Sequence, residues 1–270
     1  YKDLDDIENA FRRFASLVPE DGWVVGCGDE KRVRSVLESV SCRTRTYGLE
    51  PQNEVRAEDI SYDENGCALF TATLYGHPLT EVELQVPGEH NVKNALAVIA
   101  VASLFSLPMS LVAETLHEFR GVHRRYELTS VTDGVRVYQD YGHNPTETRN
   151  VLHVARIQAP QKLWAVLQPH TYSRTKALFD GFLTCFDEAD EVLVTDICGA
   201  REVDPGDINS GMLVDAMVKK GIHAHLTPSF DDAEAYLRAH WQPGDVVVTL
   251  GCGDIDLLNE QIARNGDTHK

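Results

Sequence analysis

The segment VRVYQDYGHNPTE, residues 135–147, decides the fold expected for this chain. Its apolar residues alternate up to residue 139, which predicts a β-strand, and the glycine and proline that follow predict a turn. Asn144 can cap a helix whose first residue is Pro145, although caps of this kind are common and by themselves imply no function. In a parallel α/β sheet, ligands bind at the carboxyl ends of the strands. The candidate site residues at this strand end are therefore Asp140, Tyr141 and His143.

Composition limits the possible partners. The chain has 270 residues, a formal net charge of -17 and a pI near 5.0. This acidity argues against nucleic acid and anionic membranes as partners, because both attract basic surfaces. The six cysteines are scattered without a CxxC pair or a zinc-ligand spacing, so reduced thiols in the cytoplasm are expected. The polar first residues do not resemble a signal peptide, and the apolar stretch 95–113 is expected to form a core helix that ends before Pro108.

The first half of the chain predicts an α/β unit with a β-rich insertion. Residues 4–17 have helical spacing, residues 23–27 form an apolar strand before a glycine turn, and residues 31–40 predict a helix. Residues 44–48 predict a further short strand. Between residues 55 and 86, short alternating runs are separated by turns, which indicates antiparallel strands that form a small subdomain or extend the sheet.

The second half repeats an alternation of strand and helix. Apolar runs at 163–168, 191–197, 223–226 and 245–250 predict strands, and a helix is expected from Lys176 to about Phe186. This rhythm predicts an open, mostly parallel sheet with helices on both faces. The polar residues expected along the rim at the strand ends are Asp140, His143, His170, Arg174, Arg201 and Asp254.

Two further patterns are compatible with nucleotide binding. Asn91 and Asn94 lie one helical turn apart, so their amides share a face and could read a purine edge; alternatively, one caps the helix and the other is merely exposed. Arg124 and Arg125 could bind phosphate oxygens, or form an ordinary solvated surface pair. Neither GxGxxG nor GxxxxGK[ST] occurs, so nucleotide binding would depend on something outside this sequence.

Four segments together resemble the Mur ligases. They are GEHNVKNA at 88–95, FRGVHRRYE at 119–127, DYGHNPTE at 140–147 and QPHTYSRT at 168–175, in the order seen in that family. The resemblance extends from the first residues to about Ile262 but covers only the later part of such an enzyme. The UDP-sugar-binding domain and the beginning of the central ATPase domain, with its phosphate loop, are not matched.

The resemblance implies an ATP-dependent amide ligase of peptidoglycan precursor synthesis. ATP would phosphorylate the carboxylate of UDP-N-acetylmuramate, and the amine of L-alanine would attack the resulting acyl phosphate. Mg²⁺ would assist phosphoryl transfer, with ligands expected mostly upstream of Tyr1. Two alternatives remain open. One is a related ligase of cell-wall recycling that attaches a preformed peptide, and the other is a non-catalytic nucleotide-binding module.

The resemblance also implies roles for individual residues. His90, Asn91 and Asn94 would border the adenine, Arg125 would reach the phosphates, and Asp140 would bind the ribose hydroxyls. Around L-alanine, the implied residues are Tyr141, His143, His170 and Arg174, with His143 and Arg174 as the catalytic pair and Arg174 on the carboxylate. Thr171 departs from the family pattern, since some members have a second arginine there, and the Cys198-Gly199 pair makes the role of Arg201 uncertain.

The expected fold class is α/β. Residues 1–119 are expected to form the latter part of a central ATPase domain with an antiparallel β extension. Residues 120–270 are expected to form a Rossmann-like C-terminal domain with a mostly parallel open sheet that binds the amino acid. The oligomeric state does not follow from the sequence.

The resemblance makes a first prediction, that the purified 270-residue chain does not ligate L-alanine, because catalysis in this family arises between domains and the phosphate loop is not in this sequence. The measurement is ATP-dependent formation of the amide product from UDP-N-acetylmuramate and L-alanine, with a longer protein that includes the upstream part as the positive control. Detectable ligation by the 270-residue chain would overturn this prediction.

Overall fold

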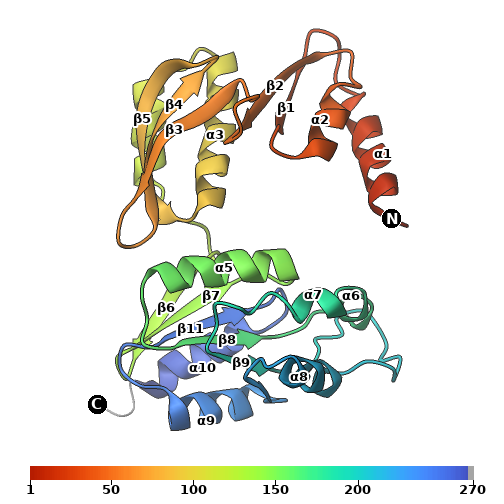
Figure 1. The fold of residues 1–270 in the computed structure, drawn as a ribbon, viewed down its shortest axis with the longest axis vertical. Helices are drawn as coiled ribbons and strands as arrows, with labels where there is room; N and C mark the ends of the chain where they lie inside the picture. Colours follow the sequence, from red (N-terminus) through yellow and green to blue (C-terminus); the bar gives the residue numbers. More distant parts are fainter. Residues whose placement is uncertain (267–270) are drawn as a thin grey trace. The chain divides into compact units, whose positions relative to one another are not determined.

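The chain folds into two separately packed units, Tyr1–Arg120 and Gly121–Lys270 (Figure 1). The structure, a computed structural model, describes residues 1–266. Each unit has its own sheet and its own helices. No helix among the described residues is both long and apolar enough to cross a bilayer.

The N-terminal unit contains a five-stranded sheet in which the strands follow chain order. The first three strands are parallel to one another, and the fourth and fifth continue the same sheet in antiparallel fashion. The predicted antiparallel strands therefore extend the sheet and do not form a separate subdomain. The strands are β1 (Trp23–Cys27), β2 (Arg43–Gly48), β3 (Val55–Tyr62), β4 (Cys67–Leu74) and β5 (His77–Pro87).

The core of this unit lies between its sheet and helix α3 (Glu89–Leu104). Leu96 and Ile99 on α3 are fully buried and pack in one cluster with Phe70 and other residues of the antiparallel strands. As predicted, the apolar stretch after residue 95 is a core helix, and α3 ends before Pro108. The other helices are α1 (Leu4–Ala15), α2 (Lys31–Leu37) and α4 (Met109–Glu118).

The C-terminal unit contains a six-stranded sheet in the order β10-β9-β8-β11-β7-β6. All neighbouring strands are parallel except the edge pair formed by β6 and β7, so the mostly parallel sheet predicted from the sequence is confirmed. The last strand of the chain lies in the middle of the sheet. The strands are β6 (Glu127–Thr132), β7 (Val135–Asp140), β8 (Leu163–Leu167), β9 (Glu191–Val194), β10 (Ala224–Leu226) and β11 (Val246–Leu250).

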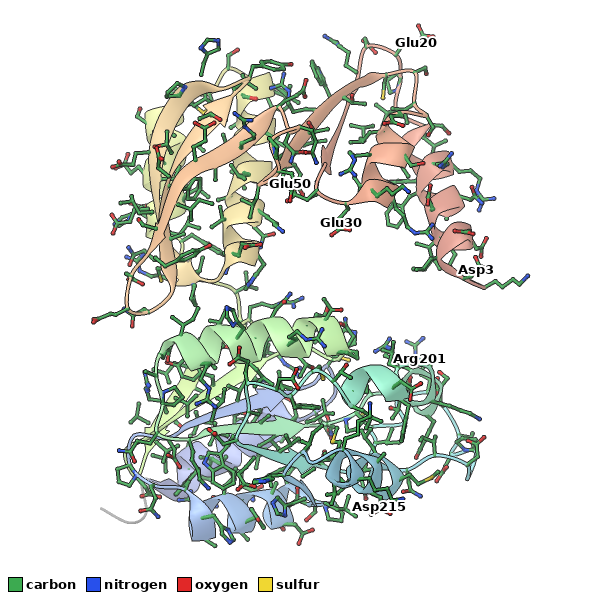
Figure 2. The ribbon with its side chains drawn as sticks, in the orientation of Figure 1. Asp3, Glu20, Glu30, Glu50, Arg201 and Asp215 are labelled. Carbon is green, nitrogen blue, oxygen red and sulfur yellow. The ribbon has the colours of Figure 1, made fainter. Side chains whose placement is uncertain are left out.

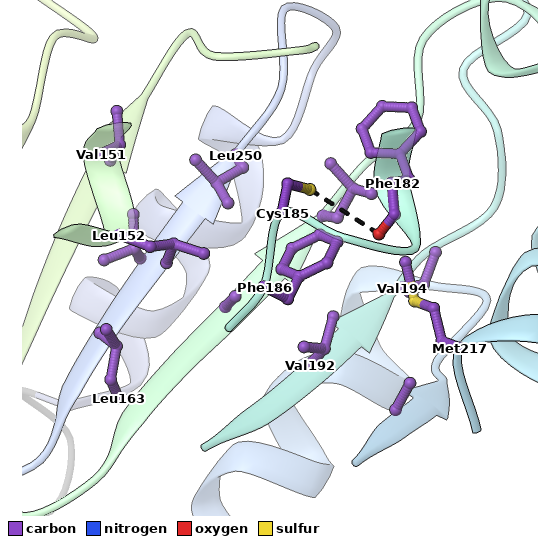
Figure 3. Packing of buried hydrophobic residues seen from close by; sticks show 14 of the residues in the cluster. Val151, Leu152, Leu163, Phe182, Cys185, Phe186, Val192, Val194, Met217 and Leu250 are labelled. Atoms are coloured by element: carbon purple, nitrogen blue, oxygen red, sulfur yellow. Dashed lines mark hydrogen bonds between the residues drawn. The ribbon is translucent and has the colours of Figure 1, made fainter. Parts of the chain in front are cut away.

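Helices cover both faces of this sheet, because successive side chains of its buried strands point to opposite faces. One face packs on α5 (Pro145–Ile157), α7 (Phe179–Phe182) and α8 (Ser210–Lys219), with Phe182 and Phe186 at the centre of the cluster (Figure 3). The opposite face packs on α9 (Phe230–His240) and α10 (Asp256–Gly266).

One predicted helix is wrong. In place of a helix from Lys176 to about Phe186, the structure has α6 (Tyr172–Ala177) and the short α7, separated at Leu178. The helix starts early because the Thr171 side chain accepts the backbone N–H of Arg174 and caps α6. Helix α7 ends at Phe182. Gly181 packs so closely on Pro145 that a Cβ at position 181 would meet the proline ring at 2.7 Å.

The buried cluster predicts the effect of a core substitution. Phe186→Ala should lower the free energy of unfolding of the C-terminal unit by about 3–5 kcal/mol, because Phe186 is 1% exposed and its removal leaves a cavity. Val203→Ala is the matched control: Val203 is 90% exposed, and its truncation should change stability by less than about 0.5 kcal/mol. Chemical denaturation of both variants measures the difference, and equal stabilities would contradict the assigned core.

Candidate functional site

Four loops meet at the carboxyl edge of the C-terminal sheet. They follow β7, β8, β9 and β11, which are neighbours in the sheet and run parallel. Backbone hydrogen bonds continue past the strand ends: Gly251 N–H donates to the Asp140 carbonyl, and Cys198 N–H donates to the Pro169 carbonyl. This edge holds most of the candidate residues of the C-terminal unit, and it is the place where parallel sheets bind ligands.

Asp140, at the end of β7, is buried and already has structural partners. Its two carboxylate oxygens accept the backbone N–H groups of Gly142 at 2.6 Å and Tyr126 at 2.8 Å. The residue is 4% exposed, and burial raises the pKa of its carboxyl group against the opposing effect of these hydrogen bonds. Asp140 therefore shapes the turn that follows β7, and the ribose contact implied by the family resemblance stays a prediction.

His143 is held in one tautomer by its surroundings. Asn144 caps α5 and Pro145 occupies its first turn, as predicted. The His143 Nδ1 atom lies 3.0 Å from the Tyr141 carbonyl oxygen, which can only accept, so Nδ1 must carry the proton in that contact. Nε2 of the neutral ring is then the basic nitrogen. Glu147 fixes the same turn by accepting the His143 backbone N–H at 3.0 Å.

His170 and Arg174 are in direct contact. This contact requires the opposite tautomer in His170 from that in His143. Arg174 Nη1 lies 3.3 Å from His170 Nδ1, and because a guanidinium can only donate, Nδ1 of His170 must be the acceptor. Burial, followed by the positive charge of Arg174, lowers the pKa of His170. His170 is therefore kept neutral next to a cation. Arg174 also lies 3.8 Å from the sulfur of Cys252.

Two residues near this pair have local structural roles. Thr171 caps α6 and has a positive φ of 62°, so the position that differs from the family pattern is used for the helix start. Glu202 accepts the Ser173 backbone N–H at 2.8 Å, which ties the loop after β9 to the first turn of α6. Arg201 is exposed (Figure 2), and no side-chain contact joins it to the other rim residues in the part of the chain that the structure describes.

The loop after β11 is held from two sides. Gln168 Nε2 donates to Asp254 Oδ1 at 2.7 Å, and Arg124 Nη2 donates to the carbonyl oxygens of Gly251 at 3.0 Å and Gly253 at 2.9 Å. Gln168 leaves no room beside this loop, since a Cβ on Gly253 would meet its side-chain oxygen at 2.4 Å. A side chain at position 253 would therefore displace the Gln168 amide from its place beside Asp254.

The two neighbouring arginines have different environments. The Arg124 guanidinium is bound to the carbonyl groups of the β11 loop, whereas Arg125 is exposed. Both guanidinium groups lie near the ring of Tyr141, with their central carbons 5.1 Å and 5.5 Å from its centroid. Arg125 is thus the member of the pair that is available to an anionic ligand.

In the N-terminal unit, the predicted amide pair lies at the start of α3. Asn94 Nδ2 donates to Asn91 Oδ1 at 3.1 Å, which confirms that the two amides share a face. Asn91 Nδ2 also donates to the Pro87 carbonyl at 2.8 Å, and neither asparagine is the N-cap, which is Gly88. His90 is exposed in the same turn. The contact of His90, Asn91 and Asn94 with adenine stays a prediction.

No metal centre can be built from the described residues. Within residues 1–266, no group of three or more histidine, cysteine, aspartate or glutamate side chains is arranged to hold a metal ion. The residues present therefore do not fit a Mg²⁺ site of their own.

Sequence reasoning missed two contributors to this edge. Cys252 and Gln168 contact Arg174 and Asp254, respectively. The available signal was their position within two residues of the ends of strands β11 and β8, where a parallel sheet places ligand-facing residues. Their partners, however, lie 78 and 86 positions away in the chain.

The fold defines an α/β protein of two separately packed units, and comparison with known sequences identifies the family. The sequence profile of the Mur ligase middle domain matches residues 1–102, and that of the Mur ligase glutamate ligase domain matches residues 124–253. The chain therefore belongs to the Mur ligase family, which confirms the resemblance predicted from four motifs.

Curated relatives and solved structures agree with this assignment. UDP-N-acetylmuramate–L-alanine ligase from Acetivibrio thermocellus is 40% identical over 98% of the chain and 57% of the relative. The Clostridium botulinum (strain Okra) enzyme of the same name is 41% identical over 96% and 57%, respectively. The structure of UDP-N-acetylmuramate-alanine ligase from Thermotoga maritima matches with a TM-score of 0.79 and 26% identity, over 100% of this chain and 56% of that one. The chain thus spans little more than half the length of these relatives.

The contact between Arg174 and His170 predicts a titration. Arg174→Gln should raise the pKa of His170, because a neighbouring positive charge that disfavours the imidazolium is removed. In the unchanged protein the folded pKa lies below the unfolded value of 6.5, so the unfolded state binds the proton first and His170 lowers stability as the pH falls below about 6.5.

NMR titration of the His170 ring measures this shift. Lys176→Gln is the matched control, since it removes a charge from the same helix but Lys176 pairs with Asp207 at 2.5 Å. An unchanged His170 titration in Arg174→Gln, or an equal shift in Lys176→Gln, would contradict the assignment.

Proposed function

We propose that this chain is part of an ATP-dependent ligase that joins L-alanine to UDP-N-acetylmuramate in peptidoglycan precursor synthesis. The observation that carries the proposal is the identity of 40–41% to relatives of that name over 96–98% of the chain. The proposed location is the cytoplasm, which agrees with six free cysteines.

The proposed reaction has two steps. ATP phosphorylates the carboxylate of UDP-N-acetylmuramate, which gives an acyl phosphate and ADP. The amine of L-alanine, after losing a proton, attacks the acyl carbon to form a tetrahedral intermediate, and inorganic phosphate leaves as the amide forms. The protein has to hold the amine in line with the acyl carbon and provide a place for its proton.

We assign the acceptor amino acid to the edge of the C-terminal unit. Arg174 would bind the carboxylate, since a guanidinium matches a carboxylate in shape and charge. His143 would accept the amine proton at Nε2, which its contact with the Tyr141 carbonyl leaves basic. Neutral His170 would keep Arg174 in place without competing for the anion, and Tyr141 would line the site.

We propose the ATP contacts of each unit by itself. In the N-terminal unit, His90, Asn91 and Asn94 would border adenine, because amides both donate and accept. In the C-terminal unit, exposed Arg125 would bind phosphate oxygens and Asp140 would face the ribose. In domain terms, residues 1–119 would be the latter part of the ATP-binding middle domain, and residues 120–270 the amino-acid-binding domain.

The longer protein that includes the upstream part tests this function against its alternatives. With ATP and UDP-N-acetylmuramate it should ligate L-alanine in preference to a cell-wall tripeptide. Preference for the tripeptide would identify a recycling ligase, and ATP binding without amide formation would identify a non-catalytic nucleotide-binding module.

The assignment of Arg174 makes a kinetic prediction. Arg174→Lys in the longer protein should raise the KM for L-alanine at least about tenfold, because an ammonium cannot form the paired hydrogen bonds of a guanidinium. The KM for ATP should stay unchanged. Arg264→Lys, at an exposed position on α10, is the matched control and should behave as the unchanged protein. An unaltered KM for L-alanine in Arg174→Lys would show that Arg174 does not bind the carboxylate.

A further inference from the structure

Arg124 joins three segments of the C-terminal unit that are distant in sequence. Its Nη2 donates to the carbonyl oxygens of Gly251 and Gly253, and its Nη1 lies 3.7 Å from Asp256 at the start of α10. Its own carbonyl accepts the backbone N–H of Tyr141 at 2.7 Å, and its guanidinium lies over the Tyr141 ring. One residue thus connects the first turn of this unit with the ends of β7 and β11.

The backbone of Arg124 is in a conformation that favours glycine. Its φ is +59°, in the left-handed region where a Cβ is unfavourable. Tyr126, two residues later, also has a positive φ, of 45°. Strained residues persist where their surroundings hold them, and they gather at functional sites. The side chain at position 124 extends from this left-handed backbone, and its guanidinium donates to two carbonyl groups of the β11 loop.

The contacts of Arg124 commit much of its guanidinium to the protein itself. The side chain is 15% exposed, and its Nη2 is already shared between two carbonyl groups. Its neighbour Arg125 is exposed, although both guanidinium groups lie near the Tyr141 ring. A positioning role through the groups that it holds therefore fits Arg124 better than direct phosphate binding.

Those groups belong to both halves of the proposed site in this unit. On the nucleotide side, Arg125, which is assigned to phosphate, follows Arg124 directly in the chain. The β11 loop that Arg124 holds starts with Gly251, whose N–H donates to the Asp140 carbonyl. On the other side, the same loop carries Cys252, which contacts Arg174, and Arg124 itself packs on Tyr141.

We propose that Arg124 is a positioning residue that fixes the β11 loop, residues 251–254, against Tyr141 and so sets the place of Arg174 for the acceptor amino acid. The expected change in the KM for L-alanine rests on the proposed ligase function. The expected change in the mobility of the β11 loop does not. Three variants separate the possibilities. Arg124→Gly removes both the guanidinium and the backbone strain. Arg124→Lys keeps the positive charge but lacks the paired N–H donors of the guanidinium. Ala159→Gly is the control, since it relieves a positive φ of 47° at an exposed residue.

Hydrogen–deuterium exchange of the 270-residue chain is the first test. Arg124→Gly should speed exchange in residues 251–258 at least about tenfold, because two charge-assisted hydrogen bonds are lost. Arg124→Lys should give an intermediate rate, since an ammonium cannot bridge both carbonyl groups as the planar guanidinium does. Ala159→Gly should match the unchanged protein. Exchange in Arg124→Gly equal to that of the unchanged protein would overturn the proposal.

Steady-state kinetics of the longer protein is the second test. Arg124→Gly should raise the KM for L-alanine at least about tenfold with little change in the KM for UDP-N-acetylmuramate, and Arg124→Lys should restore part of the loss. A fall in kcat alone, with every KM unchanged, would mean a merely structural role and would overturn the positioning. If the unchanged longer protein shows no ligation, the proposed function fails, and the exchange experiment alone decides whether Arg124 fixes the loop.

Discussion

The insertion of β11 between β7 and β8 is the constraint on which the C-terminal unit depends. Leu250 pairs with Asp140 on one side and with Leu167 on the other, so three strand ends from distant parts of the chain lie in register. Gly251 then meets the Asp140 carbonyl, and Cys252 reaches Arg174. The side chains of β11 are buried on both faces of the sheet, and their close packing there holds this register and with it the geometry of the site.

The site is organised by hydrogen bonds that set proton positions. The Tyr141 carbonyl requires a proton on His143 Nδ1, whereas Arg174 requires a lone pair on His170 Nδ1. The two imidazoles therefore have opposite tautomers, although both follow strand ends of the same sheet. Burial and nearby positive charge keep His170 neutral. Arg174 is then the cation of this pair, which suits the recognition of a single small carboxylate.

Sequence patterns predicted the parallel class of the C-terminal sheet, its strands except the edge strand β6, and the polar residues at the strand ends, because these follow from alternation, turns and caps. They did not predict that the last strand lies in the middle of the sheet, since strand order depends on contacts between distant segments. The helix expected from Lys176 was wrong because the cap at Thr171 starts it earlier. The part played by Arg124 was hidden, because its partners are 127 and 129 positions away and its left-handed backbone has no sequence signal.

The central claim is that the carboxyl edge of this sheet binds the acceptor amino acid. The most direct measurement is a crystal structure of the longer protein with L-alanine and a non-hydrolysable ATP analogue. The predicted result is an alanine carboxylate within hydrogen-bond distance of the Arg174 guanidinium, with its amine facing Nε2 of His143. Alanine bound elsewhere, with Arg174 still in contact only with His170 and Cys252, would contradict the claim.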